Sequence, residues 1–239
     1  MKKLIFSNWK NNIQSSAQAR EILDAADEYL DSVGENISFT LAFFPAPELT
    51  AEISELLKES HLSEIASLGL QDISDQTSDA RYALIGHSDR RWGMGDDDAT
   101  TNAKLKKALA MNICPVVCLG EKSRDDSYIK FLEDQTKNTF AGVRGEDISK
   151  CIIAYEPVWA ISSTPGASAD SPDSASESVR LISGILFNSY NIAPSAYLYG
   201  GSILADNIRN FTSNSVFSGV LIGKASTQKE EFIKILQTL

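Results

Sequence analysis

Eight short apolar segments, separated by amphipathic ones, dominate the sequence of this 239-residue chain. Most of the eight are continuous apolar runs, which is typical of strands buried on both faces. They lie at Lys3–Ser7, Ile37–Phe44, Ile65–Leu70, Tyr82–Ile85, Cys114–Leu119, Lys150–Tyr155, Ala196–Tyr199 and Gly219–Ile222. Seven further segments have the apolar spacing of helices: Ser16–Ser32, Ala46–Glu59, Ala99–Met111, Ser127–Phe140, Ala175–Asn188, Ala205–Ser213 and Gln228–Leu239.

This alternation of strands and helices predicts parallel strands. Eight strands in 239 residues fit a closed (β/α)₈ barrel better than an open sheet. A doubly wound sheet usually has a glycine-rich turn after its first strand, whereas here the first strand ends in SNWKNN. The Ser-rich segment Ser162–Ser178 is short enough to be a loop leading into a helix, so we expect residues 1–239 to form a single barrel domain.

The third and fourth predicted strands have too little chain between them. Only the polar segment 71–81 separates them, and it carries no helical apolar period. Parallel neighbours usually need a crossover helix. We therefore expect this helix to be missing and the segment to return along the outside of the barrel as extended or irregular chain, since an extended residue spans about 3.3 Å.

The overall charge restricts the partners. A formal net charge of −10 argues against nucleic acid and anionic membranes as broad partners, although local cations can still bind a small anion. Three cysteines without metal-ligand spacing indicate reduced thiols and a cytoplasmic protein. The apolar run at the start is too short for a signal peptide, and no later run reaches transmembrane length.

In a barrel of this kind the active site lies at the carboxyl ends of the strands, so polar residues at those ends are the candidates. In chain order these are Asn8, Lys10, Gln71, Asp72, His87, Ser88, Glu121, Glu156, Gly200, Gly201, Ser202, Gly223 and Lys224. Taken alone, Glu156 would more often be a solvated carboxylate, and His87 could equally be a structural histidine. Together they place a base, an imidazole and an ammonium on one rim.

Six segments resemble the signature segments of the triosephosphate isomerase family, in the same order: SNWKNN, ALIGHSDRR, VVCLGE, IIAYEPVWAIS, YLYGGSI and GVLIGKAS. The resemblance covers nearly the whole chain. It implies a TIM barrel that interconverts dihydroxyacetone phosphate and glyceraldehyde 3-phosphate in glycolysis and gluconeogenesis. It also implies that no metal or organic cofactor is needed, because a proton moves within one substrate.

The resemblance also implies roles for individual residues. Glu156 matches the catalytic base, whose apolar neighbours would raise its pKa once a lid excludes water. His87 matches the electrophile, a neutral imidazole in this family. Asn8 and Lys10 match the residues beside the substrate oxygen. The substrate phosphate would bind at Gly201, Ser202, Gly223 and Lys224, and at Ser162 in the lid Pro157–Thr164.

The chain also departs from the family pattern. Asp89 stands where the family has Glu, SSTPG replaces a glycine-containing lid hinge, and Lys224 replaces a glycine. The missing helix after the third strand removes, with its loop, the usual subunit contact. We therefore expect a monomer, or a homo-oligomer that uses another surface, such as an apolar face left uncovered between strands three and four.

Two alternatives to a working isomerase remain open from the sequence. One is a phosphate-binding barrel enzyme that acts on a larger sugar phosphate, although the AYEPVWAIS lid argues against a wide pocket. The other is a barrel without catalysis, which the missing helix and altered hinge favour slightly.

Overall fold

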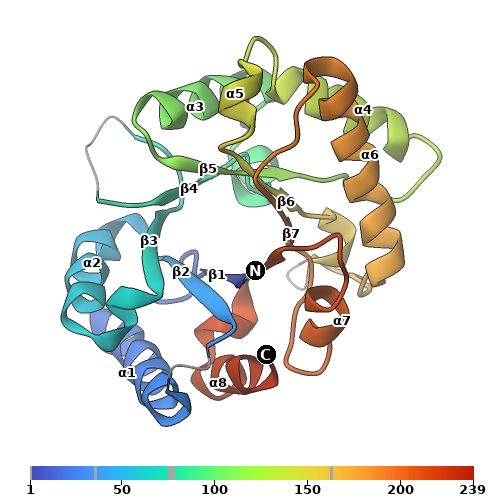
Figure 1. Ribbon diagram of the computed structural model, residues 1–239. Coiled ribbons are helices and arrows are strands. Elements are labelled where there is room, and N and C mark those ends of the chain that lie inside the picture. Colours follow the sequence, from blue (N-terminus) through green and yellow to red (C-terminus); the bar gives the residue numbers. More distant parts are fainter. Residues whose placement is uncertain (1, 35–36, 75–78, 162–163) are drawn as a thin grey trace.

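The computed structural model describes residues 2–34, 37–74, 79–161 and 164–239. Eight parallel strands close into a barrel in which each strand pairs with its sequence neighbours and β8 pairs with β1 (Figure 1). The strands are β1 Lys3–Asn8, β2 Phe39–Phe44, β3 Ala66–Leu70, β4 Tyr82–Ile85, β5 Cys114–Leu119, β6 Ile152–Tyr155, β7 Ala196–Tyr199 and β8 Gly219–Ile222. The predicted (β/α)₈ barrel is confirmed.

The helices surround this barrel, and each of the seven predicted helical segments corresponds to one. They are α1 Ser16–Val33, α2 Thr50–Glu59, α3 Asp98–Ala110, α4 Tyr128–Thr139, α6 Pro172–Tyr190, α7 Ile208–Thr212 and α8 Lys229–Thr238, of which α1, α3 and α6 extend beyond the predicted segments. Ser15 and Ser171 cap the N-termini of α1 and α6 by accepting a backbone N–H. The additional helix α5, Gly145–Ile148, is four residues long, too short for a periodic pattern to reveal it.

The connection between β3 and β4 contains no helix in its described residues, 71–74 and 79–81. The ring of helices accordingly passes from α2 to α3 with only β4 and this connection between them (Figure 1). The two strands still pair, at Gly69 with Tyr82 and at Leu70 with Ala83. The prediction of a missing crossover is confirmed for the described part of the segment.

The apolar face expected to be exposed between β3 and β4 is largely covered in the described residues, although Leu70 is half-buried and lines a hollow of about 720 Å³ beside α2. Leu68 and Ile73 are each only 7% exposed. The cause is that α2 packs closely against β3 and covers it from one side. The large apolar side chains that are exposed lie on other elements: Trp92, Met94, Ile129, Phe187 and Leu204.

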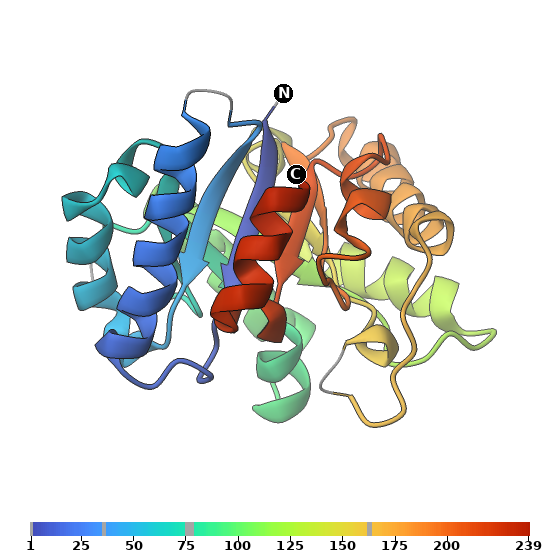
Figure 2. The same ribbon diagram turned by 90° about the horizontal axis from the view of Figure 1, so that it is seen from below.

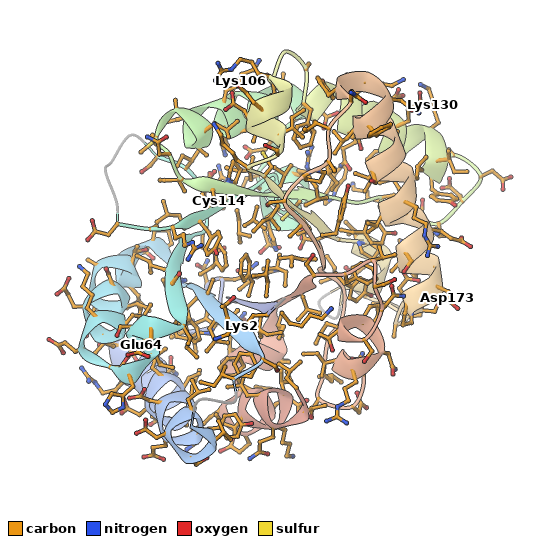
Figure 3. All side chains as sticks on the ribbon, in the orientation of Figure 1. Lys2, Glu64, Lys106, Cys114, Lys130 and Asp173 are labelled. Atoms are coloured by element: carbon orange, nitrogen blue, oxygen red, sulfur yellow. The ribbon has the colours of Figure 1, made fainter. Side chains whose placement is uncertain are left out.

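Side chains fill the inside of the barrel, so it is a packed core and not a channel (Figure 3). The rings of Phe6 and Tyr82 lie 4.7 Å apart and those of Phe6 and Phe44 5.6 Å apart. A Cβ at Gly69 would lie 2.2 Å from the Phe44 ring, which explains the glycine inside β3. This core gives the carboxyl ends of the strands a rigid base, and the loops after β4 and β6 project from that end (Figure 2).

Candidate active site

The predicted site residues meet in one cavity of about 310 Å³ at the carboxyl ends of the strands. Its lining includes Asn8, Lys10, His87, Glu156, Gly201, Ser202, Gly223 and Lys224. Ser162 lies outside the described residues. The lining also includes residues that sequence reasoning did not single out, namely Asn12, Ile203, Leu204, Leu221 and Gln228. None of them is a titratable group at the end of a strand, so only the loop arrangement identifies them.

Glu156 follows β6 and is only 4% exposed. Its Oε1 lies 3.0 Å from His87 Nε2, and its Oε2 accepts the Ser88 N–H at 3.1 Å. Burial alone raises the pKa of this carboxyl, but His87, Lys10 and the Ser88 N–H more than offset burial, so its pKa lies below the ordinary value. The expectation of a raised pKa from the sequence concerned a closed lid; in the described geometry, donors hold the carboxylate in its ionised form.

Two glycines let neighbouring backbone approach Glu156 closely. A Cβ at Gly120 would lie 1.9 Å from the Glu156 carbonyl oxygen. A Cβ at Gly200 would lie 2.8 Å from Glu156 Cγ. Both strand ends that flank β6 therefore need glycine for the carboxylate to keep this position.

His87 follows β4 and is 3% exposed. The Asp89 N–H donates to His87 Nδ1 at 3.2 Å, at the start of the π-helical turn Asp89–Gly93. A ring nitrogen that accepts a hydrogen bond carries no proton, so the neutral ring carries its proton on Nε2. Nε2 faces Glu156 in the cavity, where it can donate to an oxygen.

Lys10 reaches the same cavity from the loop after β1. Its backbone has φ of 51°, a left-handed conformation that is costly for a residue with a side chain. Lys10 Nζ lies 3.1 Å from Asp89 Oδ2. The aspartate that replaces the family's glutamate therefore still reaches this lysine, despite its shorter side chain.

Asn8, at the end of β1, joins His87 to a residue that sequence reasoning left without a role. Asn8 Nδ2 lies 2.9 Å from His87 Nε2, while Asn8 Oδ1 accepts a hydrogen bond from Gln71 Nε2 at 2.7 Å. Gln71 is the first residue after β3. The position of Gln71 at a strand end marked it as a candidate site residue in the sequence. Its hydrogen bond to Asn8 could be identified only from the tertiary structure.

The first half of the lid is tied to the barrel through Glu121. Trp159 Nε1 and the Tyr155 hydroxyl donate to Glu121 Oε1 at 3.0 and 2.8 Å, and Arg124 Nη1 lies 3.1 Å from the same oxygen. Burial and Glu121 raise the pKa of the Tyr155 hydroxyl, which therefore remains a donor. Glu121 therefore forms an ion pair with Arg124 at the rim and also holds the lid.

The amino-acid sequence and this geometry agree with comparisons to known proteins. The family model for triosephosphate isomerase matches residues 74–239. The chain belongs to the triosephosphate isomerase family. A triosephosphate isomerase of Mesomycoplasma hyorhinis is 32% identical over 255 aligned positions, which cover 98% of this chain and 98% of that protein. One from Rhodococcus jostii strain RHA1 is 30% identical over 97% of this chain and 94% of that protein.

A triosephosphate isomerase of the onion yellows phytoplasma, strain OY-M, is 37% identical over 161 residues, covering 66% of this chain and 58% of that protein. The alignment with the Mesomycoplasma protein is longer, at 255 positions, than the 239 residues of this chain. That relative therefore carries residues that this chain lacks. This agrees with a shortened member of the triosephosphate isomerase family.

The anion end of the cavity departs from the expectation in one detail. The Ser202 N–H, matched to the family's phosphate site, donates to the carbonyl oxygen of Ala160 in the lid at 3.1 Å. Lys224 begins the short 3₁₀ turn Lys224–Thr227 and is exposed. A phosphate that used the Ser202 N–H would have to displace the lid carbonyl.

Proposed function

We propose that the chain is a working triosephosphate isomerase that interconverts dihydroxyacetone phosphate and D-glyceraldehyde 3-phosphate. The observation that carries this proposal is the meeting of Lys10, His87 and Glu156 in one cavity, each within a segment that matches the family. A barrel kept only for binding would not need a buried carboxylate beside an imidazole and an ammonium, because burying such charges is costly.

Glu156 would act as the base. Its carboxylate leaves His87 and Ser88, takes a proton from the carbon beside the carbonyl, and so forms an enediolate. His87 Nε2–H donates to the oxygen that gains negative charge, and the Lys10 ammonium stabilises the same charge. The hydroxyl proton of the enediolate passes from one oxygen to the other with His87 Nε2 as the relay, and Glu156 returns its proton to the neighbouring carbon. The proton balance closes within the substrate, so this step requires no metal and no organic cofactor.

The phosphate would bind at the other end of the cavity. Gly201, Gly223 and Lys224 line it there, and glycine lets an anion approach the backbone N–H groups. The Lys224 ammonium adds a positive charge near this end. We propose that binding of the phosphate draws the Ser202 N–H away from Ala160.

We further propose that the chain works as a single barrel domain without the family's usual dimer, as a monomer or through another interface, and in the cytoplasm. The shortened β3–β4 connection supports the first point, and the three unpaired cysteines support the second. None of the helices in the described part has the length and apolar character that a membrane crossing requires. The net charge of −10 argues against nucleic acid as a partner.

The test is a coupled assay of glyceraldehyde 3-phosphate isomerisation with the wild type and Glu156→Gln. We expect the wild type to be active and the variant to lose about 10²–10⁴-fold in kcat, because the amide cannot accept the proton. Glu64→Gln, on the exposed turn before β3, is the matched control and should keep full activity. A folded wild type without activity would refute the proposed function.

A further inference from the structure

The side-chain amide of Gln71 connects three strand ends. Its Nε2 donates to Asn8 Oδ1 at the end of β1, at 2.7 Å, and to the carbonyl oxygen of Phe44 at the end of β2, at 2.6 Å. The Phe44 carbonyl oxygen can only accept hydrogen bonds, and it also accepts the Trp9 N–H at 3.0 Å. The Gln71 atom that faces it must therefore be the nitrogen. The flipped amide would place the Gln71 oxygen against two other oxygens, and its orientation is therefore fixed.

This fixed amide decides which end of Asn8 faces the cavity. Because Asn8 Oδ1 is bound to Gln71, Asn8 Nδ2 lies 2.9 Å from His87 Nε2. His87 Nε2 carries the ring proton, since Nδ1 accepts the Asp89 N–H. Two N–H donors do not bond to one another. Both residues line the cavity, where one acceptor oxygen of a ligand can take a hydrogen bond from each of them.

We propose that Gln71 is a positioning residue of the isomerase reaction. It turns the Asn8 amide so that its N–H joins that of His87 on the substrate oxygen that becomes negative. This inference rests on the proposed function, because the shared oxygen is that of the enediolate.

The position of Gln71 is itself fixed within the same chain. The next residue, Asp72, lies within 3.0 Å of Arg90 Nη2 and 2.7 Å of Lys104 Nζ, measured from its Oδ2. Arg90 belongs to the turn that follows His87, and Lys104 belongs to α3. The start of the shortened β3–β4 connection therefore braces Asn8 and His87 without a contribution from a second subunit.

Two substitutions of Gln71 separate positioning from simple packing. Gln71→Met keeps the length and removes the donor, so the Asn8 amide is free to turn, and we expect kcat to fall about ten-fold. Gln71→Glu replaces the donor by a carboxylate that only accepts. It draws Asn8 Nδ2 toward itself and turns Oδ1 toward the substrate oxygen, so we expect kcat to fall about a hundred-fold. KM should change less than about two-fold in both variants, because the phosphate contacts are untouched.

A double-mutant cycle tests whether Gln71 acts through Asn8. In the Asn8→Ala background, Gln71→Met should cause no further loss in kcat, because the group that it orients is absent. Ile73→Val is the matched structural control in the same connection: it removes a buried methylene, lowers the Tm slightly and leaves kcat unchanged.

The side-chain amide of Asn8 in a ¹⁵N-labelled sample gives a readout that does not depend on turnover. Its resonances should shift in Gln71→Glu and not in Ile73→Val. If the wild type is inactive but the Asn8 resonances still shift in Gln71→Glu, the proposed function is refuted, while the finding that Gln71 orients Asn8 stands. Two outcomes would overturn the inference. One is an active wild type together with a Gln71→Glu variant that keeps its kcat within about two-fold. The other is a loss of kcat from Gln71→Met that is equal in the wild-type and the Asn8→Ala backgrounds.

Discussion

The carboxylate of Glu156 is poised by its neighbours and not by burial. Burial by itself would keep a carboxyl protonated, yet the His87 ring, the Lys10 ammonium and the Ser88 N–H hold the charged form in place. The base is thus ionised before substrate arrives. In the proposed mechanism, the carboxylate leaves these donors when substrate binds, and losing them makes it a stronger base.

The pH dependence of kcat/KM, which reports the free enzyme, tests this arrangement. Because the pKa of Glu156 is lowered from its ordinary value of 4.5, activity should persist above that pH and be lost only as the pH falls below it. His87→Gln removes the ring that faces the Glu156 carboxylate, so the acidic limb should move to higher pH in the activity that remains.

His61→Gln is the control for that experiment, since His61 is a surface residue with a side chain that is 75% exposed. Its acidic limb should match the wild type. Circular dichroism at each pH shows that the protein stays folded. The phosphate of the substrate also titrates, with a second pKa of about 6, so the comparison with His87→Gln isolates Glu156. An unchanged limb in His87→Gln would contradict this account of Glu156.

At the scale of elements, the lid is tied together by its own side chains. The Thr164 hydroxyl donates to the carbonyl oxygen of Val158 at 2.7 Å, and the Thr164 N–H donates to Ile161 at 2.8 Å. The first half of the lid is bound to the barrel through Trp159 and Glu121. Threonine and proline in the second half thus supply order at a place where the family has a flexible hinge.

Thr164→Val tests the hydroxyl tie. It keeps the shape and removes the donor, which costs about 1 kcal/mol of lid order, and kcat/KM should fall about five-fold. Thr164→Ser keeps the hydroxyl and should stay within about two-fold of the wild type. Steady-state kinetics on both variants decides the matter, and equal activities of the two would show that the tie has no part in closing the lid.

At the scale of the whole molecule, the β3–β4 connection has no helix in its described residues and the barrel still closes, so we expect the shortening to affect assembly. The barrel closes through two residue pairs between β3 and β4, and α2 covers the strand that a further helix would have covered. Pairing of the strands, and not the helix count, is therefore what keeps the barrel closed. The same shortening removes the segment that we expect the family to use between subunits.

Size-exclusion chromatography with light scattering measures the consequence. We expect a mass near 26.1 kDa, that of one chain, and a specific activity that does not change on dilution, because Gln71 and Asp72 brace the site within one subunit. A stable species of twice that mass whose activity falls on dilution would contradict a site that is complete in one chain.

The fold and the list of candidate site residues followed from the sequence for a local reason. Strands buried on both faces must be apolar throughout, and a parallel barrel places its reactive residues after them, so Glu156 and His87 were candidates by position, and the family resemblance singled them out. Hydrogen bonds between the side chains at different strand ends could not be predicted from sequence position. Gln71 and Asn8 are 63 residues apart and meet only because their strands are near one another in the closed barrel.

The sequence by itself determined the order of the elements, the barrel and the residue types at its rim, because these depend on short-range periodicity and on where each strand ends. Only the tertiary structure decided the orientation of the Asn8 amide, the ionisation of Glu156 and the partner of Glu121. Each of these depends on atoms that several strands bring together, and on a low-dielectric interior in which distances of about 3 Å set the energies.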